Sequence, residues 1–226
     1  MSNQEQAPTQ VAAPDTADEH DRTLAPSRLL LVRHGESTWN AGRRIQGQLD
    51  PPLSERGLAQ AQEVAERFLG HRFEGLYTSD LVRARQTAER IGAAVGVEPV
   101  DEPGLREIAL GAWEGKTRED LIEEYPELWA RWSEAPDWDI VPGGEGAQPF
   151  ARRVDAALER IRERHPHGDV LCVAHGGVIQ VAILSVVGRA SRGVFPFLIE
   201  NCSVTVIQRT ARRTVVTAVN DTCHLT

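Results

Sequence analysis

Short apolar runs alternate with amphipathic segments along most of this chain, and the alternation limits the folds open to it. Apolar residues repeat at helical spacing after Ser54, from Leu81 to Val95, and over residues 150–164 and 176–187. We predict strands at residues 28–33, 73–78, 98–101, 169–174, 204–208 and 214–219. Strands that alternate with helices form a mainly parallel sheet covered on both faces. The sequence therefore predicts an α/β fold, a three-layer α/β/α sandwich.

Residues 108–146 differ in character from the rest of the chain. This stretch contains three prolines and four of the five tryptophans, Trp113, Trp129, Trp132 and Trp138. We predict short helices that form a small cap insertion over the domain. The tryptophans have two interpretations: they line a pocket for the organic part of a ligand, or they pack the cap onto the sheet. We favour packing for most of them.

The N-terminal residues and the net charge of the chain limit its expected location and partners. Residues 1–27 have almost no large apolar side chain, so we expect a disordered tail before a single folded domain at 28–226. We expect no signal peptide, and the apolar run at 178–187 is too short to span a bilayer. The net charge of −8 gives no general attraction for nucleic acid or anionic membrane.

Three cysteines, Cys172, Cys202 and Cys223, form no C-x-x-C pair and have no metal-ligand spacing. We therefore expect free thiols and a reducing, cytoplasmic location. His165 and His167 fall in a His-Pro-His-Gly stretch, which we interpret as a loop and not as metal ligands. The oligomeric state stays open, with a homodimer as one option.

Two histidines occupy equivalent places at the ends of predicted strands. His34 follows the strand at 28–33, His175 follows the strand at 169–174, and each is followed by glycine. Ligands of parallel sheets bind beyond the carboxyl ends of the strands, so we expect both histidines at one site. The helix that opens at Gly176 presents free backbone N–H groups, which favour a bound anion.

Transfer of a phosphoryl group to a side chain needs a neutral nucleophile, cationic donors and an acid for the departing oxygen. Imidazole is neutral near pH 7 and fits the first role, which points to His34. Arg33 and Arg83 are the candidate cations, and Glu107 is the candidate acid and base. Together these residues predict an anion or phosphate site. A metal site at His34, His175 and Glu107 is the alternative, but the two arginines would repel a cation.

The motifs in this chain resemble those of the histidine phosphatase superfamily, the fold shared by cofactor-dependent phosphoglycerate mutases and many small phosphatases. The resemblance covers residues 28–226. It lies in residues 33–36 (Arg-His-Gly-Glu) followed by Thr38 and Asn40, 46–47 (Gln-Gly), 53–57 (Leu-Ser-Glu-Arg-Gly), 79–88 (Ser-Asp-Leu-Val-Arg-Ala-Arg-Gln-Thr-Ala), 105–107 (Leu-Arg-Glu), 111–115 (Gly-Ala-Trp-Glu-Gly) and 173–177 (Val-Ala-His-Gly-Gly).

The resemblance implies a role for each candidate residue. His34 would become phosphohistidine, and Glu107 would protonate the leaving oxygen and then activate water. The phosphoryl group would be bound by Arg33, Arg83 and His175. The pocket rim would be formed by Asn40, Gln46 and Gly47. The substrate would be a small-molecule phosphate ester, and the resemblance implies no cofactor.

Three departures from the mutase pattern favour a phosphatase of the small broad-specificity branch. Gln48 follows the rim glycine, where mutases usually carry Trp. Residues 108–116 replace the mutase His-Tyr-Gly and Asn-Lys patterns, and the stretch from Glu107 to His175 is shorter than a mutase usually needs. The loop at 142–146 ends in Gly146 where the branch usually has Ser, so we expect a weakened start to the next helix.

Two alternatives to the phosphatase stay open. The first is a cofactor-dependent phosphoglycerate mutase, which shares the core of the fold. The second is a non-catalytic regulatory or binding module, which the intact set Arg33, His34, Arg83, Glu107 and His175 disfavours. The sequence does not identify the phosphorylated metabolite.

Overall fold

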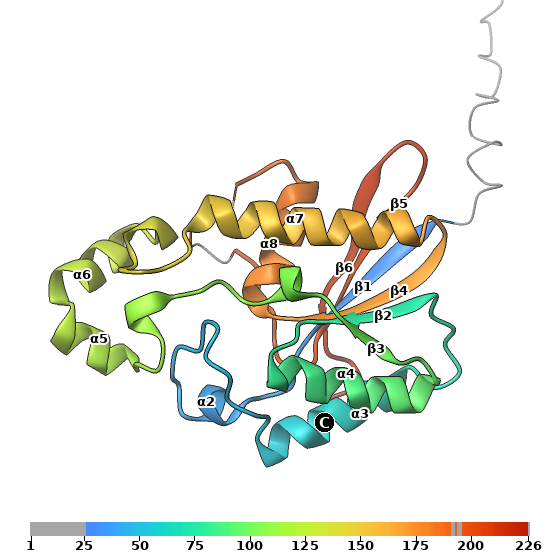
Figure 1. Ribbon diagram of the computed structural model, residues 1–226, viewed down its shortest axis with the longest axis horizontal. Helices are drawn as coiled ribbons and strands as arrows, with labels where there is room; N and C mark the ends of the chain where they lie inside the picture. Colours follow the sequence, from blue (N-terminus) through green and yellow to red (C-terminus); the bar gives the residue numbers. More distant parts are fainter. Residues whose placement is uncertain (1–25, 191–192, 194–195, 226) are drawn as a thin grey trace, which may run out of the picture.

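The computed structural model describes residues 26–190, 193 and 196–225, in which one sheet carries helices on both faces (Figure 1). The strands lie in the order β3-β2-β4-β1-β5-β6. Their bounds are β1 (Ser27–Arg33), β2 (Gly75–Thr78), β3 (Pro99–Asp101), β4 (Gly168–Ala174), β5 (Val204–Arg209) and β6 (Thr214–Asp221). The first four strands are parallel, and β5 and β6 join antiparallel. The predicted mainly parallel α/β fold is confirmed.

Alternate residues of β1 face the two helical layers. Leu29 and Leu31 are buried in a core that α7 and α8 share, whereas Leu30 and Val32 are buried in a second core with α3 and α4. The helices are α3 (Glu55–Arg67), α4 (Val82–Val95), α7 (Ala147–Arg164) and α8 (Gly176–Val186). β1 is therefore a central strand, covered on both faces and paired along both edges.

Short helices lie beyond one end of the sheet and carry the tryptophans (Figure 1). They are η2 (Gly111–Trp113), α5 (Arg118–Glu124), α6 (Pro126–Glu134) and η3 (Trp138–Ile140), whereas the preceding turn η1 (Pro103–Leu105) packs against α7. Trp132 joins the rings on either side of it, with centroids 5.3 Å from Trp113 and 4.6 Å from Trp138. All four tryptophans of this stretch pack in or against the core that contains α7 and α8, as predicted.

The start of α7 differs from the prediction. The helix begins at Ala147, three residues before the predicted start, and its N-cap Gly146 supplies no side-chain hydrogen bond. Instead, the backbone N–H of Ala147 donates to Asp139 Oδ1 at 2.8 Å. Asp139 thus performs from η3 the capping that serine would perform at position 146.

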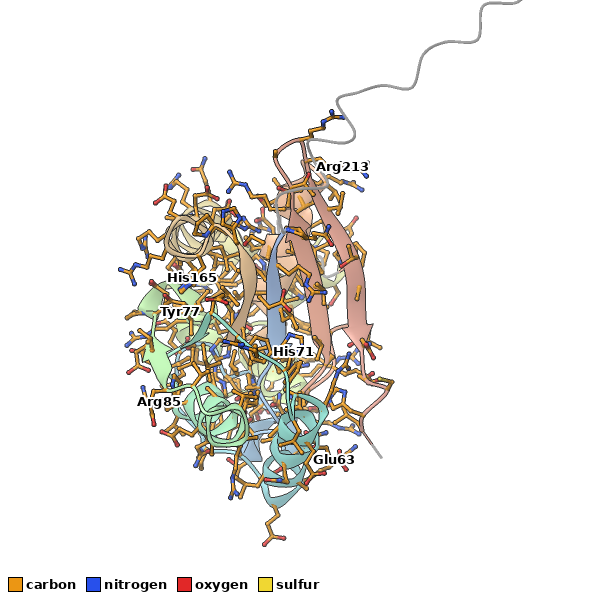
Figure 2. All side chains as sticks on the ribbon, turned by 90° about the vertical axis from the view of Figure 1, so that its right-hand side faces the viewer. Glu63, His71, Tyr77, Arg85, His165 and Arg213 are labelled. Atoms are coloured by element: carbon orange, nitrogen blue, oxygen red, sulfur yellow. The ribbon has the colours of Figure 1, made fainter. Side chains whose placement is uncertain are left out.

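Several smaller features also depart from expectation. Leu58 follows the apolar spacing after Ser54, which predicts a place on the buried face of α3, but it is 37% exposed. β2 begins at Gly75, two residues after the predicted start, and β1 begins at Ser27. His165, which agrees with the predicted loop, is the C-cap of α7. Its Nε2 lies 2.9 Å from the hydroxyl of Tyr77, and Figure 2 labels the two residues close together.

Most of the predicted tail, residues 1–25, lies outside the described residues. In the described part of the chain, Cys172 and Cys202 are buried, Cys223 is exposed, and none of the three is in a disulfide. No helix that the structure describes has the length and apolar character needed to cross a membrane.

Candidate active site

Parallel pairing of β1 with β4 brings the two predicted histidines together. Arg33 lies opposite Ala174 in the register, and the backbone N–H of His34 donates to the Ala174 carbonyl oxygen at 3.0 Å. The strands therefore end side by side, and the ring centroids of His34 and His175 are 5.1 Å apart. Both side chains are buried, with exposures of 3% and 0%.

A pocket of about 220 Å³ opens beside His34. Its walls contain seven of the predicted residues: Arg33, His34, Asn40, Gln46, Gly47, Arg83 and Glu107. Predicted residues His175 and Gly176 lie next to this pocket without lining it. The walls also contain Arg44, Ile45, Ile108 and Leu110, which sequence reasoning missed, and Trp138, for which pocket lining was the less favoured of two interpretations.

The His34 ring is held in one tautomer. Its Nδ1 lies 2.7 Å from the Gly35 carbonyl oxygen, which can only accept, so Nδ1 carries the proton. Nε2 then bears a lone pair, and it has no hydrogen bond to any residue that the structure describes. Burial, and next the charges of Arg83 and Arg33, hold the pKa of His34 well below its usual value. The imidazole is therefore neutral near pH 7, with its lone pair on Nε2.

The second histidine is fixed through its other ring nitrogen. His175 Nε2 lies 2.9 Å from Ser79 Oγ, while Nδ1 is buried and has no partner among the described residues. Burial, and next the charge of Arg83, hold the pKa of His175 well below its usual value. The ring is therefore neutral near pH 7, with unused hydrogen-bonding capacity at Nδ1.

Two arginines, the buried Arg83 and the partly buried Arg33, supply positive charge beside His34. Arg83 Nη1 and Nη2 donate to the carbonyl oxygens of Leu49 and Gly47, each at 2.8 Å, and Arg33 Nη1 donates to Ile199 O at 2.6 Å. Burial lowers the pKa of Arg83 to about 10, so the group stays charged near neutrality. The Nε–H groups of both arginines are buried and lack partners in the described structure. Buried unpaired donors of this kind suit an anion.

The Glu107 carboxylate is held by two backbone donors. Its Oε2 accepts the N–H of Gly177 at 3.1 Å, and its Oε1 accepts the N–H of Ile108 at 3.0 Å. Gly177 lies in the first turn of α8, where the helix dipole favours a negative group. The carboxylate thus lies against the helix that follows His175 and faces the pocket.

The rim residues are organised mainly by one another. Asn40 and Ser37 form the capping box of α2 (Thr38–Ala41), and Ser37 Oγ donates to Gln46 Oε1 at 2.7 Å. Gly47 has a φ of +50°, and a Cβ there would lie 2.0 Å from Glu114 Oε1. Only glycine fits this position without strain. The loop that carries Gln46 and Gly47 is therefore closely held.

This pocket is poorly suited to binding a cation. The charges of Arg83 and Arg33 act on the imidazole to which a metal would have to bind. In the residues described, no three His, Cys, Asp or Glu side chains are grouped so as to hold a metal ion. The arrangement offers a neutral nitrogen nucleophile, a cationic cradle and a carboxyl group, which are the parts that phosphoryl transfer needs.

Comparisons with known proteins agree with this geometry. A family model described as "Histidine phosphatase superfamily (branch 1)" matches residues 29–222. Phosphoserine phosphatase 1 of Hydrogenobacter thermophilus is 37% identical over 88% of this chain and 94% of its own. A probable phosphoglycerate mutase GpmB of Yersinia pestis is 33% identical over 88% and 94%. The solved structure of Bacillus stearothermophilus YhfR superposes with a TM-score of 0.81 at 31% identity, covering 88% of this chain and all of that one.

Proposed function

This chain belongs to the histidine phosphatase superfamily, and we propose that it hydrolyses small phosphate monoesters through a phosphohistidine formed on His34. It is a phosphoric monoester hydrolase that acts on small phosphorylated metabolites. The main support for His34 as the nucleophile is that its ring is neutral, protonated on Nδ1 and close to two guanidinium groups.

In the first step the lone pair of His34 Nε2 attacks phosphorus, and the bond between phosphorus and the ester oxygen breaks. The proton of the Glu107 carboxyl group passes to that oxygen, and the alcohol leaves. Arg33 and Arg83 neutralise the charge that is spread over the phosphoryl oxygens in the transition state. The open donors at their Nε–H groups support this role.

In the second step water replaces the alcohol. The Glu107 carboxylate removes a proton from the water molecule, whose oxygen bonds to phosphorus. The bond between phosphorus and Nε2 breaks, and its electron pair returns to the ring. Inorganic phosphate then leaves, and Glu107 is again protonated for the next cycle. The sum is one ester and one water converted to one alcohol and one phosphate.

Hydrolysis, and not isomerisation, is the net reaction that we propose. Gln48 occupies the position after the rim glycine, and its Nε2 donates to the Glu107 carbonyl oxygen at 3.1 Å. Gln48 therefore helps to hold the backbone that carries Glu107. Mutases usually carry a tryptophan at the position of Gln48. Supplied with 3-phosphoglycerate, the enzyme should release phosphate; dominant formation of 2-phosphoglycerate would instead establish the mutase.

We propose a small phosphorylated acid such as phosphoserine as the donor. The relative from Hydrogenobacter thermophilus is named for this activity. A pocket of about 220 Å³ suits a small ester, and Arg44 adds a third cation to its wall. Phosphate release over a panel of phosphoserine, sugar phosphates and nucleotides should be highest for phosphoserine. Equal rates across the panel would contradict this choice.

A cytoplasmic location and the absence of nucleic acid from the substrates remain proposals. Support for the first comes from the thiols of Cys172 and Cys202, which are buried and unpaired. The net charge of −8 supports the second.

A further inference from the structure

Arg153 projects from α7 towards the backbone that carries Glu107, although it does not line the pocket. Its Nη1 donates to the carbonyl oxygens of Gly104 at 3.1 Å and Arg106 at 2.7 Å. Its Nη2 donates to the Glu107 carbonyl oxygen at 2.8 Å. The Nε and Nη2 groups also donate to the two carboxylate oxygens of Glu145, at 2.6 and 2.8 Å. A guanidinium has five N–H groups, so each one has an acceptor here.

Glu145 closes the same network from the loop at residues 142–146. Its Oε2 accepts the N–H of Ala109 at 3.2 Å, and its own N–H donates to the Ala109 carbonyl oxygen at 2.9 Å. The side chains of Arg153 and Glu145 are 24% and 17% exposed. Arg153 therefore holds the segment of residues 104–109 at Gly104, and Glu145 holds it at Ala109. Both side chains are largely shielded from water.

After η1, the segment held in this way has no regular structure of its own. Residues 106–110 belong to no helix or strand, so their backbone groups lack the partners that a ladder supplies. Three of the carbonyl oxygens around Glu107 are satisfied by Arg153 instead. The place of the Glu107 carboxyl group in the pocket thus depends on a side chain that never reaches the pocket.

We propose that Arg153 and Glu145 are positioning residues that hold the Glu107 carboxyl group within reach of the leaving oxygen. The inference rests on the acid role proposed for Glu107 above. A displacement of about 1 Å at a reacting group can lower a rate about 100-fold. Lysine cannot replace Arg153, because its compact ammonium group cannot engage three carbonyl oxygens and a carboxylate in one plane.

The identity of the leaving group separates this role from a general effect on folding. An alkoxide leaves only with a proton from an acid, whereas a nitrophenolate leaves without one. Displacement of Glu107 should therefore slow phosphorylation of His34 by an alkyl phosphate and spare phosphorylation by an aryl phosphate. The readout is formation of phosphoenzyme in a single turnover, because the later hydrolysis step uses Glu107 with every substrate.

The experiment compares Arg153→Lys and Arg153→Met with the natural enzyme, using phosphoserine and p-nitrophenyl phosphate in rapid-quench mixing. We expect phosphorylation by phosphoserine to fall about 100-fold and phosphorylation by the aryl ester to fall less than about 5-fold. Glu145→Gln should show the same selectivity with a smaller loss. Equal losses for both esters, or no loss, would overturn the proposal.

A double variant makes the test independent of folding. In a Glu107→Gln background the acid is already gone, so adding Arg153→Met should change the alkyl-to-aryl ratio no further. If the effects of Glu107→Gln and Arg153→Met on this ratio multiplied in the double variant, Arg153 would act independently of Glu107. Glu159→Gln is the matched control, because Glu159 also lies on α7 and pairs with an arginine, Arg209, at 2.7 Å. That variant should keep both phosphorylation rates.

Failure of the proposed function gives a different result. If the natural enzyme forms no phosphohistidine with either ester, the role of His34 is wrong. If it does form phosphohistidine but Glu107→Gln shows no leaving-group selectivity, the acid role is wrong. The positioning proposal fails alone when Glu107→Gln is selective and the Arg153 variants are not.

Discussion

The Nδ1–H of His34 donates to the carbonyl oxygen of the next residue, Gly35, across 2.7 Å. A hydrogen bond between neighbours of this kind fixes both the rotation of the ring and the site of its proton. The nitrogen left with a lone pair is the one without a partner among the described residues. The nucleophile is thus prepared by its own backbone before any substrate enters.

Removal of the nucleophile should end turnover without unfolding the protein. We expect His34→Ala to lower the rate of p-nitrophenyl phosphate hydrolysis by at least about 10⁴-fold, because no other group can form the covalent intermediate. Phosphate release and acid-labile protein-bound phosphate check the activity, and circular dichroism checks the fold. Full activity of the variant would exclude the proposed mechanism.

Stability should fall as the pH falls below about 6.5, the usual pKa of histidine. Burial holds the pKa values of His34 and His175 well below this value in the folded protein. Between the two pKa values of each group, the unfolded chain binds a proton that the folded chain does not. The free energy of unfolding should therefore decrease by about 1.4 kcal/mol per pH unit for each histidine in that window.

Urea unfolding of the natural protein and of His34→Gln at pH 7.5, 6.5 and 5.5 measures how much His34 contributes to the pH dependence of the free energy of unfolding. Titrating groups away from the pocket contribute equally to both proteins, so the difference reports His34 together with its effect on the neighbouring His175. We expect a flatter pH dependence in the variant. Identical slopes would show that His34 does not stay neutral on folding.

Substitution of Gly47 by alanine should damage the pocket. The new Cβ would lie 2.0 Å from Glu114 Oε1, and the backbone has a φ of +50°. We expect a loss of about 1–3 kcal/mol in the free energy of unfolding and at least about a 10-fold loss of activity, because the Gly47 carbonyl oxygen also binds Arg83. Gly70→Ala is the matched control, since it shares a positive φ of 77° but has nothing within 4 Å of the new Cβ. Unchanged activity in Gly47→Ala would contradict the close fit.

The capping of α7 by Asp139 should be measurable. Asp139→Ala leaves the Ala147 N–H without its acceptor, and we expect a loss of about 1 kcal/mol in urea unfolding. Gly146→Ser should not compensate in this variant, because position 146 has a φ of +81°, which is strained for serine. A stabilising Gly146→Ser substitution would refute this account of the helix start.

Chelation should leave the activity unchanged. The mechanism proposed for this pocket uses Arg33 and Arg83 where other phosphatases use metal ions, and these groups would repel a cation near His34. Phosphate release in the presence of excess EDTA, after dialysis, should match the untreated rate. Recovery of lost activity by added Mg²⁺ or Zn²⁺ would reopen the metal alternative.

The sequence predicts the chemical centre of the site better than its walls. His34 and His175 follow regular strands, whose pairing places their ends together, so periodicity suffices to locate them. Arg44, Ile45 and Leu110 line the pocket from irregular segments, and no periodic pattern marks the direction of a side chain in a loop. Trp138 was predicted as a packing residue, yet it both packs and lines the pocket.

Errors in the helices have a similar origin. Leu58 has the spacing of a buried residue on α3 but lies in the first turn of the helix and is 37% exposed. The cap of α7 comes from Asp139, eight residues earlier, so the local sequence around Gly146 could not reveal it. A contact between separate segments therefore decides the start of α7.

The central place of β1 has a consequence for motion. Its backbone amides are bonded within a sheet that is covered on both faces, and such amides exchange with solvent only when much of the protein opens. The nucleophile follows this strand, whereas Arg44 and Ile45 lie on a loop at the surface. We expect deuterium to label residues 42–49 long before residues 28–34. Mutations in that loop can therefore alter which esters enter while the strand before His34 stays protected.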